Sequence, residues 1–472
     1  MSQAAAQTES MPSPRRTRRP WWLKWTIIPL LVVLCPLLAI HYFDNAAAER
    51  ALAEAVAEAD RLDPGWRLEE LEAARRQIPD DKNGALVVLS AHRKMPAKWT
   101  PDIDEIFSFP PPVRLDEKSV KELRDAMKPV TGVISEARRM IDFPEGRFAI
   151  TYGPDLFKSP APEHHQMVRT TGFVLQLDGW LQLQDGQFEQ AWKSSRAILN
   201  TGRSLGDEPL LMAQFIRIAL RRIAGGLLER TLAQGELDEP KLAEMQKALG
   251  EETREPLFLR CLRGERACMY RTFLHWGKEG ISWEELPRGR SSYLNDGRLW
   301  IAGKTAQLRE GNAWTLHFNT KVIEDWKKPG VPRHQAVKDL QDSMREWDKK
   351  LVGWLLFVAA PQKVAQSQQN SDVHLHCDSA ALAAERFRLL KNRWPKSLDE
   401  LVKAGLLKEI PIDLMDGKPL RFRRTIDGLV IYSVGADGTY RGDALDNLAN
   451  FDPRKDRPEF RLWDLKRRGV SK

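Results

Sequence analysis

An apolar run near the N-terminus is the strongest hydrophobic pattern in the chain. It covers Trp21 to Phe43, and Lys24 is its single charged residue. About 20 helical residues span the hydrocarbon core of a bilayer. Three tryptophans at the start of the run, with Tyr42 and Phe43 at its end, are typical of the two membrane interfaces. The pattern therefore predicts one transmembrane helix over residues 21–43, with the lipid bilayer as its partner.

The charges on the two sides of this run predict its orientation. Residues 1–20 form a basic tail with four arginines, whereas Asp44 and several glutamates follow the run. Because basic residues stay on the cytoplasmic side, we expect a cytoplasmic N-terminus and an extracytoplasmic body on a bacterial inner membrane. The alternative is a signal peptide cleaved near Ala46–Ala48, for which this apolar run is long.

Helical periodicity continues through most of residues 44–376, which predicts a mostly α-helical body. The Ala- and Glu-rich segment Asn45–Leu62 should extend the membrane helix outward as a stalk. Further on, Gln166–Gln184 and Phe188–Leu199 should form a helical hairpin around Asp185-Gly186. This turn resembles that of a tetratricopeptide repeat, but no second copy follows, so an ordinary α-hairpin is the simpler interpretation.

Composition excludes some classes of function. The net charge of +8 is concentrated in the two ends of the chain, and the body between them is close to neutral. Nothing therefore points to a nucleic-acid partner. The basic residues after position 453 are expected to form a solvated tail. Four cysteines are too few for a disulfide scaffold, and Cys261 and Cys268, about 10 Å apart along one helix, are too distant to form a bridge.

Candidate chemistry in the body is sparse. No common catalytic motif occurs, so an enzyme is less expected than a structural protein. His164 and His165 are adjacent in a predicted loop and would need a third ligand that the sequence does not place. His374 and His376 would point to one side if their segment were extended, as metal sites often require. The sequence leaves two alternatives: a metal site on an extended segment, or a segment that only connects to the following helix.

Tryptophans are concentrated between residues 276 and 354. They could stack against carbohydrate, which would suit an envelope hydrolase or a carbohydrate-binding protein. Their irregular spacing instead favours large core residues whose indole N–H finds a partner. The segment holds seven of them, at positions 276, 283, 300, 314, 326, 347 and 354.

The end of the chain has the most specific order of local signals. An apolar helical stripe that begins near Ala380 ends at Trp394-Pro395. Ser397 and Glu400 have the spacing of a capping box for a short helix over residues 398–403. Two alternating segments, Leu420–Thr425 and Leu429–Val434, should form a hairpin through the Asp-Gly pair at 427–428. We expect a small α+β domain over residues 377–465 and a basic tail over 466–472.

This order resembles the C-terminal globular domain of the major pseudopilins of type II secretion. In that family a helix ends in a Trp/Tyr-Pro string, and a loop with Pro and Asp then leads to strands that close on a Gly-x-Asp-Gly sequence. The matching residues here are Asn392, Arg393, Trp394, Pro395, Ser397, Leu398, Glu400, Leu401, Pro411, Asp413, Gly417, Pro419, Phe422, Tyr432, Ser433, Gly435, Asp437 and Gly438.

The resemblance has limits and one chemical implication. The chain lacks the processing motif that precedes the hydrophobic helix of pseudopilins, and its own apolar run lies more than 300 residues before the module. We therefore expect a pseudopilin-like domain at the C-terminal end of a different kind of protein, rather than a pilus subunit. In the family, the loop after this string binds Ca²⁺, which implies Asp437 as one ligand here and Asp443 or Asp446 as another.

Together these patterns predict a mainly α fold: a single N-terminal transmembrane helix, a body of helical hairpins, and a small C-terminal domain with a short antiparallel sheet. The expected function is that of a non-enzymatic structural or interaction protein of the cell envelope. Its partner would be an envelope protein, linked to secretion or pilus-like machinery. The alternative remains an envelope hydrolase or carbohydrate-binding protein that uses residues 276–354.

Overall fold

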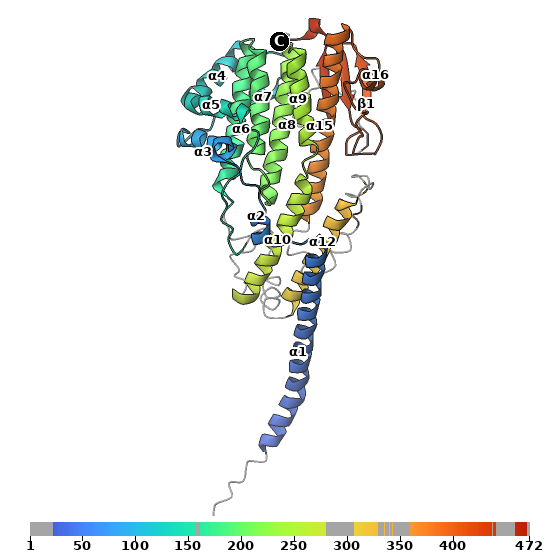
Figure 1. Ribbon diagram of the computed structural model, residues 1–472. Helices are drawn as coiled ribbons and strands as arrows, with labels where there is room; N and C mark the ends of the chain where they lie inside the picture. The colour runs from blue at the N-terminus through green and yellow to red at the C-terminus, as the bar shows by residue number, and fades with distance from the viewer. Residues whose placement is uncertain are drawn as a thin grey trace, which may run out of the picture.

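The fold is mainly α-helical, and a small antiparallel sheet lies near the C-terminus (Figure 1). The computed structural model describes residues 22–155, 161–279, 306–328, 359–436, 438–439 and 458–469, together with positions 335, 339 and 342. These elements confirm the predicted fold class.

A long helix, α1 (Trp22–Leu62), projects from one end of the body (Figure 1). Its apolar residues from Leu30 to Phe43 are exposed, and they give the helix the length and hydropathy needed to cross a membrane. The second half of the helix packs on α12 (Gln307–Lys327), where Ala55 and Ala59 are buried. The predicted stalk therefore continues the apolar helix without a break.

Charge pairing fixes the point where α1 ends. Asp63 follows the last helical residue and is buried. Its carboxylate accepts hydrogen bonds from Arg263 (2.8 Å) and Arg266 of α10 (Leu257–Glu279), and from Lys327 of α12 (3.1 Å). Burial by itself would raise the pKa of Asp63, but the two guanidinium groups hold it below its ordinary value. The stalk is thus joined to two body helices through one carboxylate.

The body is built from antiparallel helices around one large core. The helices after α1 are α2 (Leu68–Ala73), α3 (Gly84–Arg93), α4 (Glu117–Met127), α5 (Thr131–Ala137), α6 (Glu163–Gln184), α7 (Phe188–Arg203), α8 (Leu211–Gln234), α9 (Glu239–Glu252), α10 and α12. Short 3₁₀ segments lie at Asp80–Lys82, Asp104–Ser108, Lys128–Val130, Arg138–Asp142 and Leu465–Arg467. The predicted hairpin is confirmed as α6 and α7, with Gly186 at positive φ in the turn.

Helices α6 and α8 approach closely because glycines of one face leucines of the other. A Cβ on Gly172 would lie 2.2 Å from Cδ2 of Leu220, and a Cβ on Gly179 would lie 2.5 Å from Cδ2 of Leu227. The glycines and the leucines are both spaced by seven residues, so each pair meets on the same helix faces. These contacts hold α8 against the hairpin.

The long helix before the sheet runs along one side of the body, and the sheet lies toward the end away from α1 (Figure 1). Helix α15 (Ala359–Lys391) packs on α8 and α9, and is followed by α16 (Leu398–Lys403). The sheet has the order β1 (Arg421–Thr425), β2 (Gly428–Tyr432), β3 (Glu459–Trp463), and all its pairs are antiparallel. Thr425 pairs with Gly428, and Gly428 with Trp463.

Three local expectations were wrong. The described end of the chain is not a solvated tail, because β3 is in the sheet and Arg468 donates to both oxygens of Glu385 at 2.9 Å. Ser397 precedes α16 but makes no capping bond, and Glu400 instead accepts from Lys396 N at 3.0 Å. The pattern LEELEAARRQ also predicts a helix over Trp66–Gln77, but the observed helix α2 covers only Leu68–Ala73.

The boundary predicted at residue 377 lies within α15, so no break in the helix marks it. The same helix contacts the bundle and the sheet, and Gly469 N donates to Ala233 O at 3.1 Å at the end of α8. The sheet is therefore attached to the helical body along an extended contact.

The close approach of α6 and α8 generates a stability test. We expect Gly172→Ala to destabilise the protein relative to Gly226→Ala by about 1–3 kcal/mol, since the new methyl group overpacks the contact with Leu220. Gly226 is a matched control because it lies in α8 with open space around it. Both substitutions gain a similar helix propensity. Chemical denaturation measures the difference, and equal effects would contradict the close packing.

Candidate functional site

His164 and His165 lie in the first turn of α6, not in a loop as the sequence suggested. Both side chains are buried. The third partner that the sequence did not place is Glu208, which lies in the connection between α7 and α8. The three residues form a compact group whose potential ligand atoms all lie within 4.8 Å of one another.

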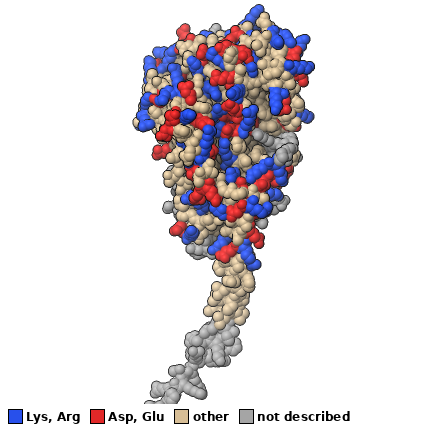
Figure 2. Space-filling model, viewed as in Figure 1, with Lys and Arg blue, Asp and Glu red and all other residues tan. Residues whose placement is uncertain are grey.

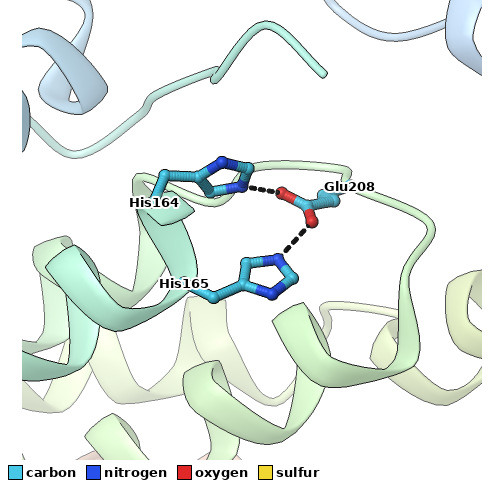
Figure 3. A group of neighbouring side chains, drawn as sticks. All are labelled: His164, His165 and Glu208. Carbon is cyan, nitrogen blue, oxygen red and sulfur yellow. Dashed lines mark hydrogen bonds and ion pairs between the residues drawn. The ribbon is translucent and has the colours of Figure 1, made fainter. Parts of the chain in front are cut away.

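The carboxylate of Glu208 lies between the two imidazole rings (Figure 3). Nε2 of His164 is 2.8 Å from Oε2, and Nε2 of His165 is 2.5 Å from Oε1. The rings are nearly perpendicular, with centroids 4.7 Å apart. Each imidazole therefore uses a different carboxylate oxygen, and both rings turn the same type of nitrogen toward it.

Neighbouring groups fix this arrangement from both sides. The ring of Phe148 stacks on His164 with centroids 4.3 Å apart and an interplanar angle of 10°. The main-chain oxygen of Glu208 accepts a hydrogen bond from Gln214 Nε2 at 2.6 Å. Asp207 accepts from Arg75 Nε at 3.1 Å and from the backbone of Arg76 at 2.8 Å. The loop that carries Glu208 is thus held to the segment after α2.

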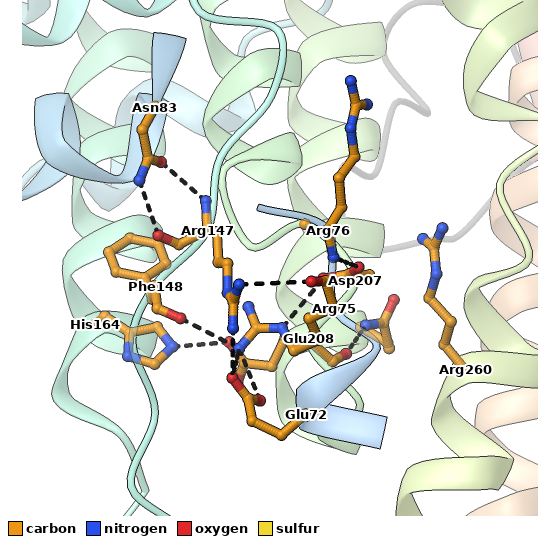
Figure 4. Close-up of polar contacts among 12 residues, drawn as sticks. Glu72, Arg75, Arg76, Asn83, Arg147, Phe148, His164, Asp207, Glu208 and Arg260 are labelled. Carbon is orange, nitrogen blue, oxygen red and sulfur yellow. Dashed lines mark hydrogen bonds and ion pairs between the residues drawn. The ribbon is translucent and has the colours of Figure 1, made fainter. Parts of the chain in front are cut away.

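A second polar layer, which spans α2 and the segment 145–152, adjoins the group (Figure 4). Glu72 accepts hydrogen bonds from Arg75 (3.0 Å), Arg147 (3.1 Å) and the phenol of Tyr152 (2.8 Å). Arg75 also donates to the backbone oxygen of Phe148 at 3.2 Å. The stacked Phe148 is therefore held by its backbone as well as by its ring.

The electrostatics favour an ionised Glu208. Complete burial by itself would raise the pKa of this carboxyl, but the hydrogen bonds from His164 and His165 hold it below its ordinary value. Burial and the Glu72 carboxylate raise the pKa of Tyr152, so its phenol remains a hydrogen-bond donor. Nδ1 of His165 is buried and has no hydrogen-bond partner within the described ranges. Chemically, the group can hold protons or a cation between two imidazoles and one carboxylate.

The second histidine pair does not form a comparable site. His374 and His376 lie within α15, so the extended geometry that would bring both rings to one face is absent. His376 Nδ1 lies 2.9 Å from the backbone oxygen of Ile412. The interpretation of this pair as metal ligands on an extended segment was wrong.

The calcium prediction concerns residues that the structure does not describe. Asp437, Asp443 and Asp446 all lie outside the described ranges. The strand end that leads toward them is fixed by buried Asp413, which accepts from Ser433 Oγ (2.7 Å) and Val434 N (3.0 Å). The Ca²⁺ site therefore stays a prediction.

Three of the seven tryptophans are described, and all three pack against neighbours. Trp276 is buried and donates to Asp155 at 2.7 Å. Trp314 stacks on Phe318 with centroids 4.9 Å apart, and Trp326 contacts Phe258. These three residues follow the expectation of core packing. Positions 283, 300, 347 and 354 lie outside the described residues.

Comparison of the chain with protein-family models, with curated proteins and with solved structures found no match. The site must therefore be interpreted from its own geometry. Sequence reasoning found the two histidines but missed Glu208, which is 43 residues beyond His165. The Asp-Glu-Pro string that contains it gives no local signal, because only the packing of α6 against the α7–α8 connection brings it close.

The Glu208 contacts generate a pH-dependent prediction for the metal-free protein. Because the folded-state pKa of Glu208 is lowered, its contribution to stability is present above the ordinary value of 4.5 and is lost as the pH falls through the folded pKa. With metals chelated, Glu208→Gln should lower the free energy of unfolding by roughly 1–3 kcal/mol at pH 7, since the buried imidazoles lose a charged acceptor. The destabilisation caused by Glu208→Gln should become smaller as the pH is lowered, because Glu208 of the wild type is then protonated.

The exposed neighbour Glu163 is the matched control, since Glu163→Gln makes the same chemical change on the surface of the first turn of α6. It should change the free energy of unfolding by no more than about 0.5 kcal/mol. Urea denaturation between pH 3 and pH 8 compares the two variants. This account of the site would be overturned if Glu208→Gln destabilised the protein no more than Glu163→Gln does, or if its destabilisation grew as the pH was lowered.

Proposed function

We propose that this protein is a single-pass protein of the bacterial inner membrane with a structural or interaction role in the envelope. The N-terminal basic tail lies in the cytoplasm, the apolar half of α1 crosses the bilayer, and the helical body stands outside the cytoplasm. Its membrane-distal sheet contacts an envelope protein of secretion or pilus-like machinery.

The observation that carries this proposal is the continuity of α1. The apolar, exposed half and the packed half belong to a single helix. The candidate cleavage sequence Ala46–Ala48 lies inside that helix, and Ala48 is only 1% exposed. Cleavage there would divide this helix, whereas a retained anchor keeps a rigid connection to the body. The geometry therefore supports retention over cleavage.

The surface of the body agrees with a soluble domain beside a membrane. On the face shown in Figure 2, basic and acidic side chains are interspersed, while residues 30–43 of the projecting helix α1 include neither. No field of a single sign dominates this face, which gives no support to a nucleic-acid partner. The bilayer is the partner that the exposed half of α1 fits.

The partner surface is assigned to the tip of the sheet. Ile426, in the β1–β2 turn, is 87% exposed, and Leu465, just after β3, is 51% exposed. The two turns are joined by a 2.7 Å hydrogen bond from Asp464 N to Asp427 O. Large exposed apolar residues at one place favour a binding surface. The resemblance of this module to pseudopilins suggests the class of partner.

The hydrolase or carbohydrate-binding alternative has less support. Trp276, Trp314 and Trp326 are packed against neighbouring side chains rather than displayed on one face. The described group of converging histidines and carboxylate lies at residues 164–208, outside the tryptophan-rich segment.

Membrane topology gives the first test of this proposal. In spheroplasts treated with external protease, a tag fused after Lys472 should be removed, whereas a tag fused before Met1 should be protected. Lysed spheroplasts are the control, and both tags should then be digested. Protection of the C-terminal tag in intact spheroplasts would contradict the orientation.

The partner surface has its own test. Cross-linking in membranes followed by purification through a C-terminal tag should recover an envelope protein with the wild type. Ile426→Ser with Leu465→Ser should lose it. Met212→Ser is the matched control, since Met212 is a similarly exposed apolar residue, 50% exposed, at the start of α8. Equal recovery by both variants would remove the sheet tip as the contact surface.

A further inference from the structure

We propose that His164, His165 and Glu208 bind a divalent transition-metal ion of the zinc class. This site goes beyond the anchoring and interaction roles proposed above and does not depend on them. It is also distinct from the predicted calcium loop, which concerns other residues near the C-terminus.

The donor set selects the class of metal. Two imidazole nitrogens and one carboxylate are ligands typical of zinc and similar borderline ions. Calcium and magnesium take oxygen ligands instead, so a site with two histidines disfavours them. No thiol belongs to the group. The described cysteines of the body, Cys261, Cys268 and Cys377, are buried elsewhere in the helical core.

The geometry is close to that of a metal centre without an ion. Zinc ligands lie about 2.0–2.2 Å from the metal, so two ligand atoms are usually separated by somewhat more than 3 Å. The Nε2 atoms lie 2.8 Å and 2.5 Å from the Glu208 oxygens, and all ligand atoms are within 4.8 Å of one another. A small opening of the carboxylate away from the rings would admit the ion between them (Figure 3).

The surroundings favour a formed site rather than a chance contact. Phe148 fixes the plane of the His164 ring, and Gln214 fixes the backbone of Glu208. The exposed fractions of the three residues are 7%, 4% and 0%, so water competes weakly for the ligand atoms. Ligands held in place before binding lose little conformational freedom when the metal enters.

Metal binding would change which nitrogen of each imidazole ring carries the hydrogen. In the metal-free protein, each Nε2 atom must carry a hydrogen to donate to the Glu208 carboxylate. When Nε2 becomes a ligand, a neutral imidazole carries that hydrogen on Nδ1 instead. Nδ1 of His165 has no acceptor among the residues described, so in the metal-bound form its N–H would require a water molecule as acceptor.

The same contacts suggest what the ion would do. His164 and His165 start α6, and Glu208 belongs to the connection that leads into α8. A metal held by all three would link the start of one core helix to the approach of another. Three protein ligands would leave a fourth position for water or another small ligand.

Metal analysis of the full-length protein in detergent tests this site. After removal of metals by a chelator and dialysis against Zn²⁺, the wild type should retain a single zinc ion per chain and melt at a higher temperature. Glu208→Gln and His165→Gln should weaken binding by about 100-fold or more, beyond the upper end of what loss of an outer-shell partner causes. Zinc retention by both variants at wild-type affinity would overturn the proposal.

His317→Gln is the matched control. His317 lies 2.5 Å from Glu58 in an exposed pair, so the substitution removes a histidine–glutamate contact outside the site. It should leave zinc binding unchanged. If His317→Gln lost zinc binding and Glu208→Gln kept it, the metal would be bound at His317, and the proposal would be overturned.

A spectroscopic measurement on the unaltered protein covers the case in which a variant fails to fold. Co²⁺ substituted for zinc should give the visible bands of a four- or five-coordinate site with nitrogen and oxygen ligands. A thiolate-to-cobalt charge-transfer band would instead show cysteine ligation and would overturn the proposal. Absence of any protein-bound Co²⁺ spectrum would overturn it equally.

Discussion

The hydrogen-bonded carboxylate of Asp63 is the interaction on which the arrangement of α1 relative to the body depends. It ends α1 and accepts from two arginines of α10 and from Lys327 of α12. Breaking a buried ion pair by removing one partner typically costs about 3–5 kcal/mol, and here that argument applies to Arg266, whose buried guanidinium would lose its compensating charge. Without this joint, α1 would be held to α12 by its packed alanines and by exposed polar contacts such as those of Arg309 with Asn45 and of His317 with Glu58. With it, the long N-terminal helix enters the body at a fixed position.

Buried charge also organises the interior of the bundle. Glu252 at the end of α9 accepts from Arg203 Nε (2.5 Å), Arg217 Nη2 (3.0 Å) and Arg221 Nε (2.6 Å). Burial by itself would raise the pKa of Glu252, but the three guanidinium groups hold it well below its ordinary value. Arg217 and Arg221 interrupt the apolar pattern of α8, as expected for a helix of the body rather than of a membrane. The same principle appears at Glu208, where two imidazoles take the place of arginines.

Local signals in the sequence predicted much of the fold. The apolar run at 21–43, the Asp185-Gly186 turn and the Asp-Gly pair at 427–428 each predicted an element that the structure contains. Strand β3 was missed although Phe460 and Leu462 alternate with polar residues, because the basic composition of that end suggested a solvated tail. The first half of α15 was not predicted, because its polar residues do not form an apolar stripe. Gln368 and Asp372 are nevertheless buried there, and Gln368 donates to Asp372 at 2.6 Å. Glu208 could not be found, since only tertiary packing brings it to the histidines.

Retention of the N-terminal helix is the central claim, and the mass of the mature chain tests it most directly. Membranes washed with alkaline carbonate retain integral proteins, and intact mass spectrometry then shows where the chain begins. The account predicts a chain in the washed pellet that still carries the basic tail of residues 1–20, apart from removal of the initiator Met1. A shorter chain that begins near Glu49 and is found in the soluble fraction would contradict it.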